Sequence, residues 1–354
     1  MNLPRTMRAA VYRGIDDIRI EEVPVPEIGP RELLVKVAAC GVCPTDIKKI
    51  HYGTVPPPRI FGHETAGTIV RAGSRIRAFK LGDRVALHHH VPCLKCHACR
   101  HRAFAQCADY KKTGITAGFE PAGGGFAEYV RVMESVLPGV VKIPPRNSFL
   151  EGAMLEPVNT VLKAVKMLPL LRGDHVLIAG QGPIGLMFTR LLQLAGARVI
   201  ATDLLDERLS LAKKFGGTLA LDPISAGFEK AVLKLTGGIG LDAAVIAVPS
   251  NEAVRQAQNL LRGGGHLLLF AHTKRGDEMP IDPSAICVDE KQLLGSYSSD
   301  FLIQKEVADL VFHRKLDVRK LITHTLPLEK TADAIALAAK ATPGALKIVV
   351  CPEK

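Results

Sequence analysis

The chain has 354 residues, of which 47% are hydrophobic and 23% are charged, which is enough apolar material for about two packed domains. No apolar run reaches the roughly 18 residues of a membrane-spanning helix, and the first residues lack the apolar segment of a secretory leader, so we expect a cytoplasmic protein without a membrane span. Lys and Arg number 46 against 35 Asp and Glu, a formal charge of +11. Because the basic residues are scattered and the chain has no Trp, we expect a solvated basic surface and no nucleic-acid partner.

The first part of the chain, residues 1–156, predicts an irregular domain made mostly of β-strands. Short strand-like runs alternate there with Gly and Pro. The expected strands cover residues 8–12, 32–39, 66–71, 84–87 and 127–132.

The middle part, residues 157–297, predicts a doubly wound parallel sheet. After an apolar-periodic helix at 158–168, strand and helix signals alternate five times, as is typical of this α/β architecture. The expected strands cover residues 175–180, 198–203, 218–221, 243–248, 266–271 and 292–297. The expected helices between them cover residues 184–194, 207–215, 228–236 and 252–261.

The last part, residues 298–354, predicts two helices at 304–314 and 331–340 and a final strand at 347–351. This segment is too short to bury a core of its own. We therefore expect it to return to the first domain.

Eight cysteines are the first specific sign of chemistry, because five of them fall between residues 43 and 107. In a reducing compartment such clustering favours metal binding over disulfides. Four of them follow the spacing Cys-x2-Cys-x2-Cys-x7-Cys, and four thiolates suit a tetrahedral, structural zinc with no open position, although an iron–sulfur cluster is the alternative. The four are Cys93, Cys96, Cys99 and Cys107. Outside the five, Cys40, Cys287 and Cys351 are predicted to be core residues.

A glycine-rich turn at residues 180–185, Gly-Gln-Gly-Pro-Ile-Gly, follows a predicted strand and opens a predicted helix. In a dinucleotide site the first Gly makes the tight turn, the second admits the pyrophosphate and the third lets helix and strand pack closely. A simple glycine turn in an α/β sheet is the alternative. The residues expected to bind the dinucleotide are Gly180, Gly182, Pro183, Ile184 and Gly185.

Asp203 stands 18 residues after Gly185, at the end of the next predicted strand. A carboxylate there can accept both hydroxyls of the adenosine ribose and would repel a 2′-phosphate, which predicts NAD rather than NADP. A helix-capping Asp is the alternative. Arg208 is expected either to cover the adenine or to be a solvated helix residue.

Three separate segments each offer a zinc ligand: Cys43, His63 and Glu156. A catalytic zinc has three protein ligands and an open fourth position for water or substrate oxygen, and these three residue types supply such a set. Taken singly, each would more often be structural. Their occurrence together with a dinucleotide motif predicts a catalytic metal.

These motifs, taken in order, resemble the zinc-containing medium-chain dehydrogenase/reductase superfamily over nearly the whole chain. Residues 62–67 read Gly-His-Glu-Thr-Ala-Gly, residues 82–85 read Gly-Asp-Arg-Val and residues 127–129 read Ala-Glu-Tyr, in the family's order with the cysteine and glycine motifs. The resemblance implies a GroES-like β catalytic domain followed by a Rossmann domain, with the active site in the cleft between them. It also implies a homo-oligomer, either a dimer or a tetramer.

The resemblance assigns roles to several residues. Cys43 and His63 correspond to ligands of the catalytic zinc, and Thr45 to the hydroxyl that contacts the zinc-bound alcohol. His51 stands where many members have a histidine that passes the proton to solvent, a role suited to an imidazole, and a surface histidine is the alternative.

The third zinc ligand separates branches of the superfamily. Primary alcohol dehydrogenases have Cys there, whereas Glu156 in the segment Leu-Glu-Pro-Val resembles the branch of sorbitol, iditol, galactitol and threonine dehydrogenases. A carboxylate is a harder ligand than a second thiolate. Members of that branch use either this Glu or the one after the zinc-binding His, so Glu64 is expected to alternate with Glu156 or to reach the zinc through water.

Residues and resemblance together predict a zinc-dependent oxidoreductase that transfers hydride between a secondary alcohol, a polyol, and NAD, giving a ketone. Two zinc ions per chain are expected, one catalytic and one structural. The alternatives are a threonine 3-dehydrogenase or a general zinc alcohol dehydrogenase, and, less well supported, a zinc-free reductase or a non-catalytic NAD-binding protein. The partner is a small-molecule alcohol, and its pocket is expected to include Phe119, Tyr297 and the loop at residues 50–55.

Overall fold

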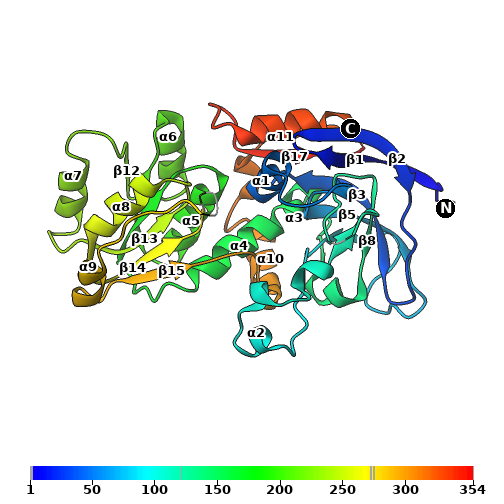
Figure 1. The fold of residues 1–354 in the computed structure, drawn as a ribbon, viewed down its shortest axis with the longest axis horizontal. Helices are drawn as coiled ribbons and strands as arrows, with labels where there is room; N and C mark the ends of the chain where they lie inside the picture. The colour runs from blue at the N-terminus through cyan, green and yellow to red at the C-terminus, as the bar shows by residue number, and fades with distance from the viewer. Residues whose placement is uncertain (1–2, 121, 272, 274–275, 354) are drawn as a thin grey trace. The chain divides into compact units, whose positions relative to one another are not determined.

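The computed structural model describes residues 3–120, 122–271, 273 and 276–353. These residues form two compact units. The first unit contains the described residues up to Asn159 and again from Ser299 onward, and the second unit contains Thr160–Ser298 (Figure 1).

An eight-stranded sheet runs through the first unit. Its main order is β16-β17-β3-β5-β6-β9, and β8 pairs with β3 and with β7. The central strand β3 is buried along nearly its whole length because it has neighbours on both edges and cover on its faces. The strands are β3 (Leu33–Gly41), β5 (Glu64–Ala72), β6 (Arg84–Ala86), β7 (Ile115–Thr116), β8 (Tyr129–Val132), β9 (Val141–Lys142), β16 (Ile322–Leu326) and β17 (Lys347–Val350).

A second, three-stranded sheet of the first unit has the order β2-β1-β4. Its strands are β1 (Thr6–Gly14), β2 (Asp17–Pro24) and β4 (Arg59–Ile60). The helices of this unit are α1 (Pro44–Tyr52), α2 (His97–Arg100), α3 (Phe149–Ala153), α10 (Gln304–Phe312) and α11 (Thr331–Ala339). Its 3-10 turns are η1 (Phe104–Gln106), η2 (Tyr110–Lys112), η3 (Glu134–Gly139), η4 (Phe301–Ile303), η5 (Val318–Lys320) and η6 (Leu328–Lys330).

The second unit is a parallel sheet with the order β12-β11-β10-β13-β14-β15, drawn from green to orange in Figure 1. This order reverses between β10 and β13, and in open α/β sheets ligands bind at the carboxyl ends of the strands beside such a reversal. The strands are β10 (His175–Ala179), β11 (Arg198–Thr202), β12 (Leu219–Leu221), β13 (Leu241–Ile246), β14 (Leu261–Leu269) and β15 (Gln292–Gly295). The connecting helices are α5 (Pro183–Leu194), α6 (Asp206–Lys214), α7 (Phe228–Leu235), α8 (Asn251–Leu260) and α9 (Pro283–Val288). The predicted doubly wound sheet is confirmed.

Helix α4 (Leu155–Val165) fastens the C-terminal segment to the first unit through Asn159. The Asn159 side chain is fully buried, and its Nδ2 donates to the Asp300 carbonyl at 2.9 Å and to Gln304 Oε1 at 2.7 Å. Its Oδ1 accepts the Asp300 N–H at 2.8 Å. One amide thus satisfies two half-buried backbone groups of Asp300 and the side-chain oxygen of the buried Gln304.

Several elements were not predicted. Helix α1 buries a single apolar side chain, Ile50, but Pro44 at its first turn and Gly53 at its C-cap, with φ +60°, are ordinary signals for helix ends. Strands β2 and β16 are half-exposed, so their sequences lack the apolar runs by which strands were recognised. In β14 the first residues form a glycine-rich extension of the expected strand.

The prediction that Cys287 is a core residue is wrong. Cys287 is exposed because helix α9 has no buried residue. Cys40 is buried and Cys351 is half-buried. Among the described residues, no helix combines the length and apolar character required to cross a membrane.

Asn159→Ala should lower the free energy of unfolding by about 2–4 kcal/mol, because it leaves buried groups of Asp300 and Gln304 without hydrogen-bond partners. Urea unfolding measures this. Asn259→Ala, at an exposed position of α8, is the control and should change stability by no more than about 0.5 kcal/mol. Equal stability of the two variants would contradict the role of Asn159.

Candidate functional site

Three residues with different ligand chemistry come together in the first unit: Cys43, His63 and Glu64. One ligand atom of each lies within 4.8 Å of those of the other two. Cys43 directly precedes helix α1, and Glu64 opens strand β5. A thiolate, an imidazole and a carboxylate form a donor set that suits zinc with an open position. The group therefore fits a catalytic metal.

The turn that presents His63 depends on Gly62, whose φ is +95°. A Cβ at this position would stand 2.7 Å from Cys40 Sγ and 2.9 Å from the Phe126 backbone nitrogen. Both the left-handed backbone and this crowding exclude a side chain.

Asp46 holds the ring of His63. The Asp46 carboxylate is 1% exposed, and its Oδ1 lies 3.1 Å from His63 Nδ1. A donor N–H at Nδ1 leaves Nε2 as the ligand atom, which is how carboxylates orient metal-binding histidines. Burial opposes charge on both groups, yet their mutual attraction lowers the pKa of Asp46 and, with Cys43, raises that of His63 well above its usual value. A proton and a metal therefore compete for this imidazole.

Glu64 is neutralised by a buried lysine from the last strand. Lys347 Nζ lies 2.6 Å from Glu64 Oε1 and 2.5 Å from Oε2, and it donates to the Val42 carbonyl at 2.9 Å. Burial lowers the pKa of Lys347, but Glu64 more than offsets this and raises it. A Cβ on Gly41 would stand 1.9 Å from Glu64 Oε2, so this glycine provides the space that the carboxylate occupies.

Glu156 lies in the first turn of α4 and is 4% exposed. Burial raises the pKa of its carboxyl group to about 7. Its Oε1 is 3.4 Å from Nδ1 of the buried His89. The 4.8 Å group contains Glu64 rather than Glu156, so the choice of Glu156 as the direct ligand stays a prediction.

The two predicted proton-transfer residues both lie on α1. Thr45 Oγ1 donates to Cys43 Sγ at 3.2 Å, which places its hydroxyl directly at the candidate metal ligand. His51 is exposed on the same helix, and its Nδ1 is 3.1 Å from Asp16 Oδ2. These positions agree with a hydroxyl at the site and an imidazole in contact with solvent.

The four-cysteine motif forms a compact lobe around α2. The four Sγ atoms lie within 4.8 Å of one another. Backbone N–H groups of Lys95 and Cys96 lower the pKa of Cys93 to about 6, which favours the thiolate that a metal requires. Four converging thiolates leave no position for substrate, as in structural zinc sites.

The glycine turn of the second unit has the geometry that a dinucleotide needs. Gly180 has φ +90°, and a Cβ on Gly185 would stand only 1.8 Å from the Gly180 carbonyl oxygen. In contrast, a Cβ on Gly182 would meet no atom within 4 Å. Pro183 begins α5 directly after this open position, and Ile184 follows it. Space in front of a helix N-terminus fits a pyrophosphate.

Asp203 follows β11 and is tied to that turn. Its Oδ2 accepts the Gln181 N–H at 2.7 Å and its Oδ1 accepts the Leu205 N–H at 3.0 Å. Arg208 Nη1 lies 3.7 Å from the same carboxylate. The structure thus brings Asp203 and Arg208 together beside the glycine turn.

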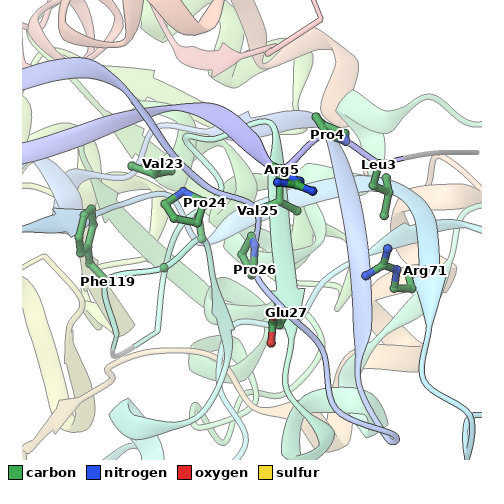
Figure 2. A pocket seen from close by; sticks show the side chains of 12 residues that line it. Leu3, Pro4, Arg5, Val23, Pro24, Val25, Pro26, Glu27, Arg71 and Phe119 are labelled. Atoms are coloured by element: carbon green, nitrogen blue, oxygen red, sulfur yellow. The ribbon is translucent and has the colours of Figure 1, made fainter.

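A separate cavity of about 750 Å³ opens in the first unit (Figure 2). It is lined by residues between Val23 and Glu27, by Arg5 and Arg71, and by Phe119. None of the predicted metal ligands is among its lining residues. Phe119 therefore lines a cavity whose lining residues do not include Cys43, His63 or Glu64.

Two family models match the chain. A model described as the alcohol dehydrogenase GroES-like domain matches residues 29–145, and one described as a zinc-binding dehydrogenase matches residues 183–313. A sorbitol dehydrogenase of Bacillus subtilis (strain 168) is 31% identical over 99% of this chain and 99% of its own length. The chain belongs to the zinc-containing medium-chain dehydrogenase/reductase superfamily.

Solved structures of this superfamily are also similar to the chain. A protein described as a zinc-binding dehydrogenase from Sinorhizobium meliloti 1021, bound to NADP, is 31% identical with a TM-score of 0.88, covering 98% of this chain and 99% of that one. The 2R,3R-butanediol dehydrogenase from Bacillus subtilis is 28% identical with a TM-score of 0.86, at the same coverage. This superfamily member is therefore an oxidoreductase of the zinc alcohol dehydrogenase type.

Sequence reasoning missed four residues that build the site. Asp46 follows Cys43 by three positions on an unpredicted helix, and its only signal was a carboxylate in the first turn after Pro44. Gln181 is fully buried in the glycine turn, where its Oε1 accepts the Thr189 hydroxyl at 2.8 Å. The other two are Lys347 and His89, which reach the site from distant segments.

Gly185→Ala should lower the free energy of unfolding by at least about 2 kcal/mol, because the added methyl group overlaps the Gly180 carbonyl. Gly182→Ala is the matched control, with open space and φ −67°, and should change stability by less than about 0.5 kcal/mol while weakening dinucleotide binding. Urea unfolding and nucleotide titration measure the two effects. Equal destabilisation by both variants would contradict this division of roles.

Proposed function

We propose that this chain is a zinc-dependent dehydrogenase that oxidises a secondary alcohol of the polyol class to a ketone and reduces NAD. The observation that carries the proposal is the convergence of Cys43, His63 and Glu64 in a member of this superfamily. Two further points support the polyol class: by resemblance Glu156 stands at the position where primary alcohol dehydrogenases have Cys, and a sorbitol dehydrogenase is similar over 99% of the chain.

Cys43 and His63 would hold the catalytic zinc together with Glu156, and Glu64 would alternate with Glu156 or act through water. Zinc bound there supplies a Lewis acid that lowers the pKa of the substrate hydroxyl. Asp46 keeps the proton of His63 on Nδ1 and so directs Nε2 toward the metal position. A second zinc would be held by Cys93, Cys96, Cys99 and Cys107, with a structural role.

Oxidation of the alcohol removes one proton and one hydride. Thr45 Oγ1, adjacent to Cys43, would accept the hydroxyl proton while it gives up its own toward His51, and His51 would release a proton to solvent from its exposed position beside Asp16. NAD, when bound, would supply the oxidant that takes the hydride from the substrate carbon. The alcohol thus loses two electrons and two hydrogens, and the products are a ketone, NADH and a proton.

Asp203 supports NAD as the coenzyme. Its carboxylate is 8% exposed and is fixed by the N–H groups of Gln181 and Leu205. Acceptors at this place suit ribose hydroxyls, whereas a 2′-phosphate would bring a second negative charge next to the first. The turn formed by Gly180 and Gly185 would bind the pyrophosphate in the space at Gly182, with Arg208 beside the adenosine.

The cysteine ligands indicate in which compartment the protein acts. Four cysteine ligands must stay reduced to bind zinc, and this favours the cytoplasm. The resemblance to the superfamily supports a homo-oligomer, a tetramer or a dimer.

The decisive assay is NAD reduction by the zinc-replete protein on a panel of polyols, threonine, and simple primary and secondary alcohols. We expect turnover on a polyol with a secondary hydroxyl. Cys43→Ser and His63→Ala should each lower kcat/KM at least about 1,000-fold, because each removes a ligand of the Lewis acid, while NADH binding stays within about twofold.

Cys287→Ser is the matched control, since it removes an exposed thiol that is not a predicted metal ligand, and it should retain activity within about twofold. Full activity of Cys43→Ser would contradict the metal assignment. Turnover confined to primary alcohols would contradict the polyol assignment, and turnover confined to threonine would establish the alternative.

Asp203→Ser should raise kcat/KM for NADP relative to NAD by about 100-fold, because it removes a negative charge from the position that a 2′-phosphate would occupy. Steady-state kinetics with both coenzymes measure the ratio. Asp206→Ser removes an exposed carboxylate three residues further along and should leave the ratio within about threefold. A wild-type enzyme that prefers NADP would contradict the assignment of Asp203.

A further inference from the structure

A buried contact joins the predicted metal centre to two segments that the proposed mechanism does not use. His89 is 5% exposed, and its Nδ1 lies 3.4 Å from Glu156 Oε1 and 3.4 Å from the Ser299 hydroxyl oxygen. The ring centroids of His89 and His63 are 5.3 Å apart. One imidazole therefore contacts a predicted ligand and lies against another.

Helix α4 and the returning C-terminal segment hold this contact in place. Glu156 and Asn159 are three positions apart on α4 and so lie on the same face of the helix. Asn159 binds both backbone groups of Asp300, the residue after Ser299. The helix that carries Glu156 therefore also fixes the segment that carries Ser299.

The neighbouring histidine fixes His89 from the other side. His90 stacks on Tyr110 with 4.6 Å between ring centroids and 17° between ring planes. Tyr110 is 2% exposed and packs in the four-cysteine lobe with Cys99 and Cys107. The residue after His89 is thus packed against the four-cysteine lobe, which limits how far the loop after β6 can shift away from Glu156.

The side-chain chemistry of His89 and Glu156 indicates which of them donates the hydrogen bond. An imidazole N–H can donate to a carboxyl oxygen, and we assign the proton of His89 to Nδ1, the nitrogen that faces Glu156. Ser299 can accept from the same N–H. A hydrogen bond from His89 to Glu156 Oε1 fixes the carboxylate and leaves its other oxygen available as a metal ligand.

We propose that His89 is a positioning residue of the catalytic metal centre, whose Nδ1–H, shared with the Ser299 hydroxyl, fixes the Glu156 carboxylate beside Cys43, His63 and Glu64. The inference rests on the proposed function, because it assumes that this group binds a metal. It adds to that function the residue that orders one of its two carboxylates.

Cobalt(II) in the catalytic position is the probe, because its visible absorption reports the ligands around it and titration gives its affinity. With the four-cysteine lobe kept loaded with zinc, His89→Phe should weaken cobalt binding about 10- to 100-fold and shift the absorption bands. His89→Asn, which retains an N–H donor close to the position of Nδ1, should recover the affinity to within about threefold of wild type. His90→Phe, which keeps a ring on Tyr110, is the control and should bind cobalt within about twofold of wild type.

A double-variant comparison tests whether His89 acts through Glu156. In a Glu156→Ala background, adding His89→Phe should weaken cobalt binding by no more than about threefold further, because the carboxylate on which His89 acts is already absent. Losses that multiply would overturn the inference, as would a folded His89→Phe protein with unchanged affinity and spectrum. If the phenyl ring prevents folding, His89→Leu replaces it in the same comparison.

Cys43→Ser separates this inference from the function on which it rests. Loss of the cobalt spectrum in Cys43→Ser together with unchanged behaviour of the His89 variants would overturn the role of His89 alone. An unchanged spectrum in Cys43→Ser would instead overturn the metal centre itself.

Discussion

The burial of negative charge is the constraint on which the first unit depends. Asp46, Glu64 and Glu156 are each at most 4% exposed, and moving a carboxylate out of water costs several kcal/mol unless a cation or an N–H donor compensates. Each has a different partner: Asp46 pairs with His63, Glu64 with Lys347 and Glu156 with His89. The partners come from the turn before β5, the last strand and the loop after β6, so the tertiary structure is what brings the charges into balance. The divalent cation proposed for this group would add further positive charge beside the carboxylates.

The two units carry different chemical groups and so suit different ligands. The first unit concentrates thiol, imidazole and carboxylate groups, which suit a metal and a proton, while the turn of the second unit offers backbone N–H groups and open space, which suit a pyrophosphate. Gly182 and Gly185 have different roles in that turn. Gly182 leaves room for a ligand, and Gly185 lets the helix approach the strand. Neither site needs a large apolar cavity.

The sequence was informative where a short segment carries its own signal. The parallel sheet, the glycine turn with Asp203, and the four-cysteine spacing are local patterns, and each was predicted within a few residues of its observed place. Helix α1 was missed because Ile50 is its only buried apolar side chain, and the role of Asp46 was missed with it. Lys347 and His89 could not be predicted, because an isolated Lys in a strand or a run of histidines has no meaning until the sheet pairs β17 with β3 and the C-terminal segment packs on α4.

The most direct measurement is X-ray absorption at the zinc K-edge of the purified, zinc-replete protein, together with its zinc content. The account predicts two zinc ions per chain with an average of about 2.5 sulfur neighbours, because Cys43 and the four cysteines of the lobe are shared between two ions. One zinc per chain with about four sulfur neighbours would mean that only the lobe binds metal. That result would contradict the catalytic centre at Cys43, His63 and the buried carboxylates.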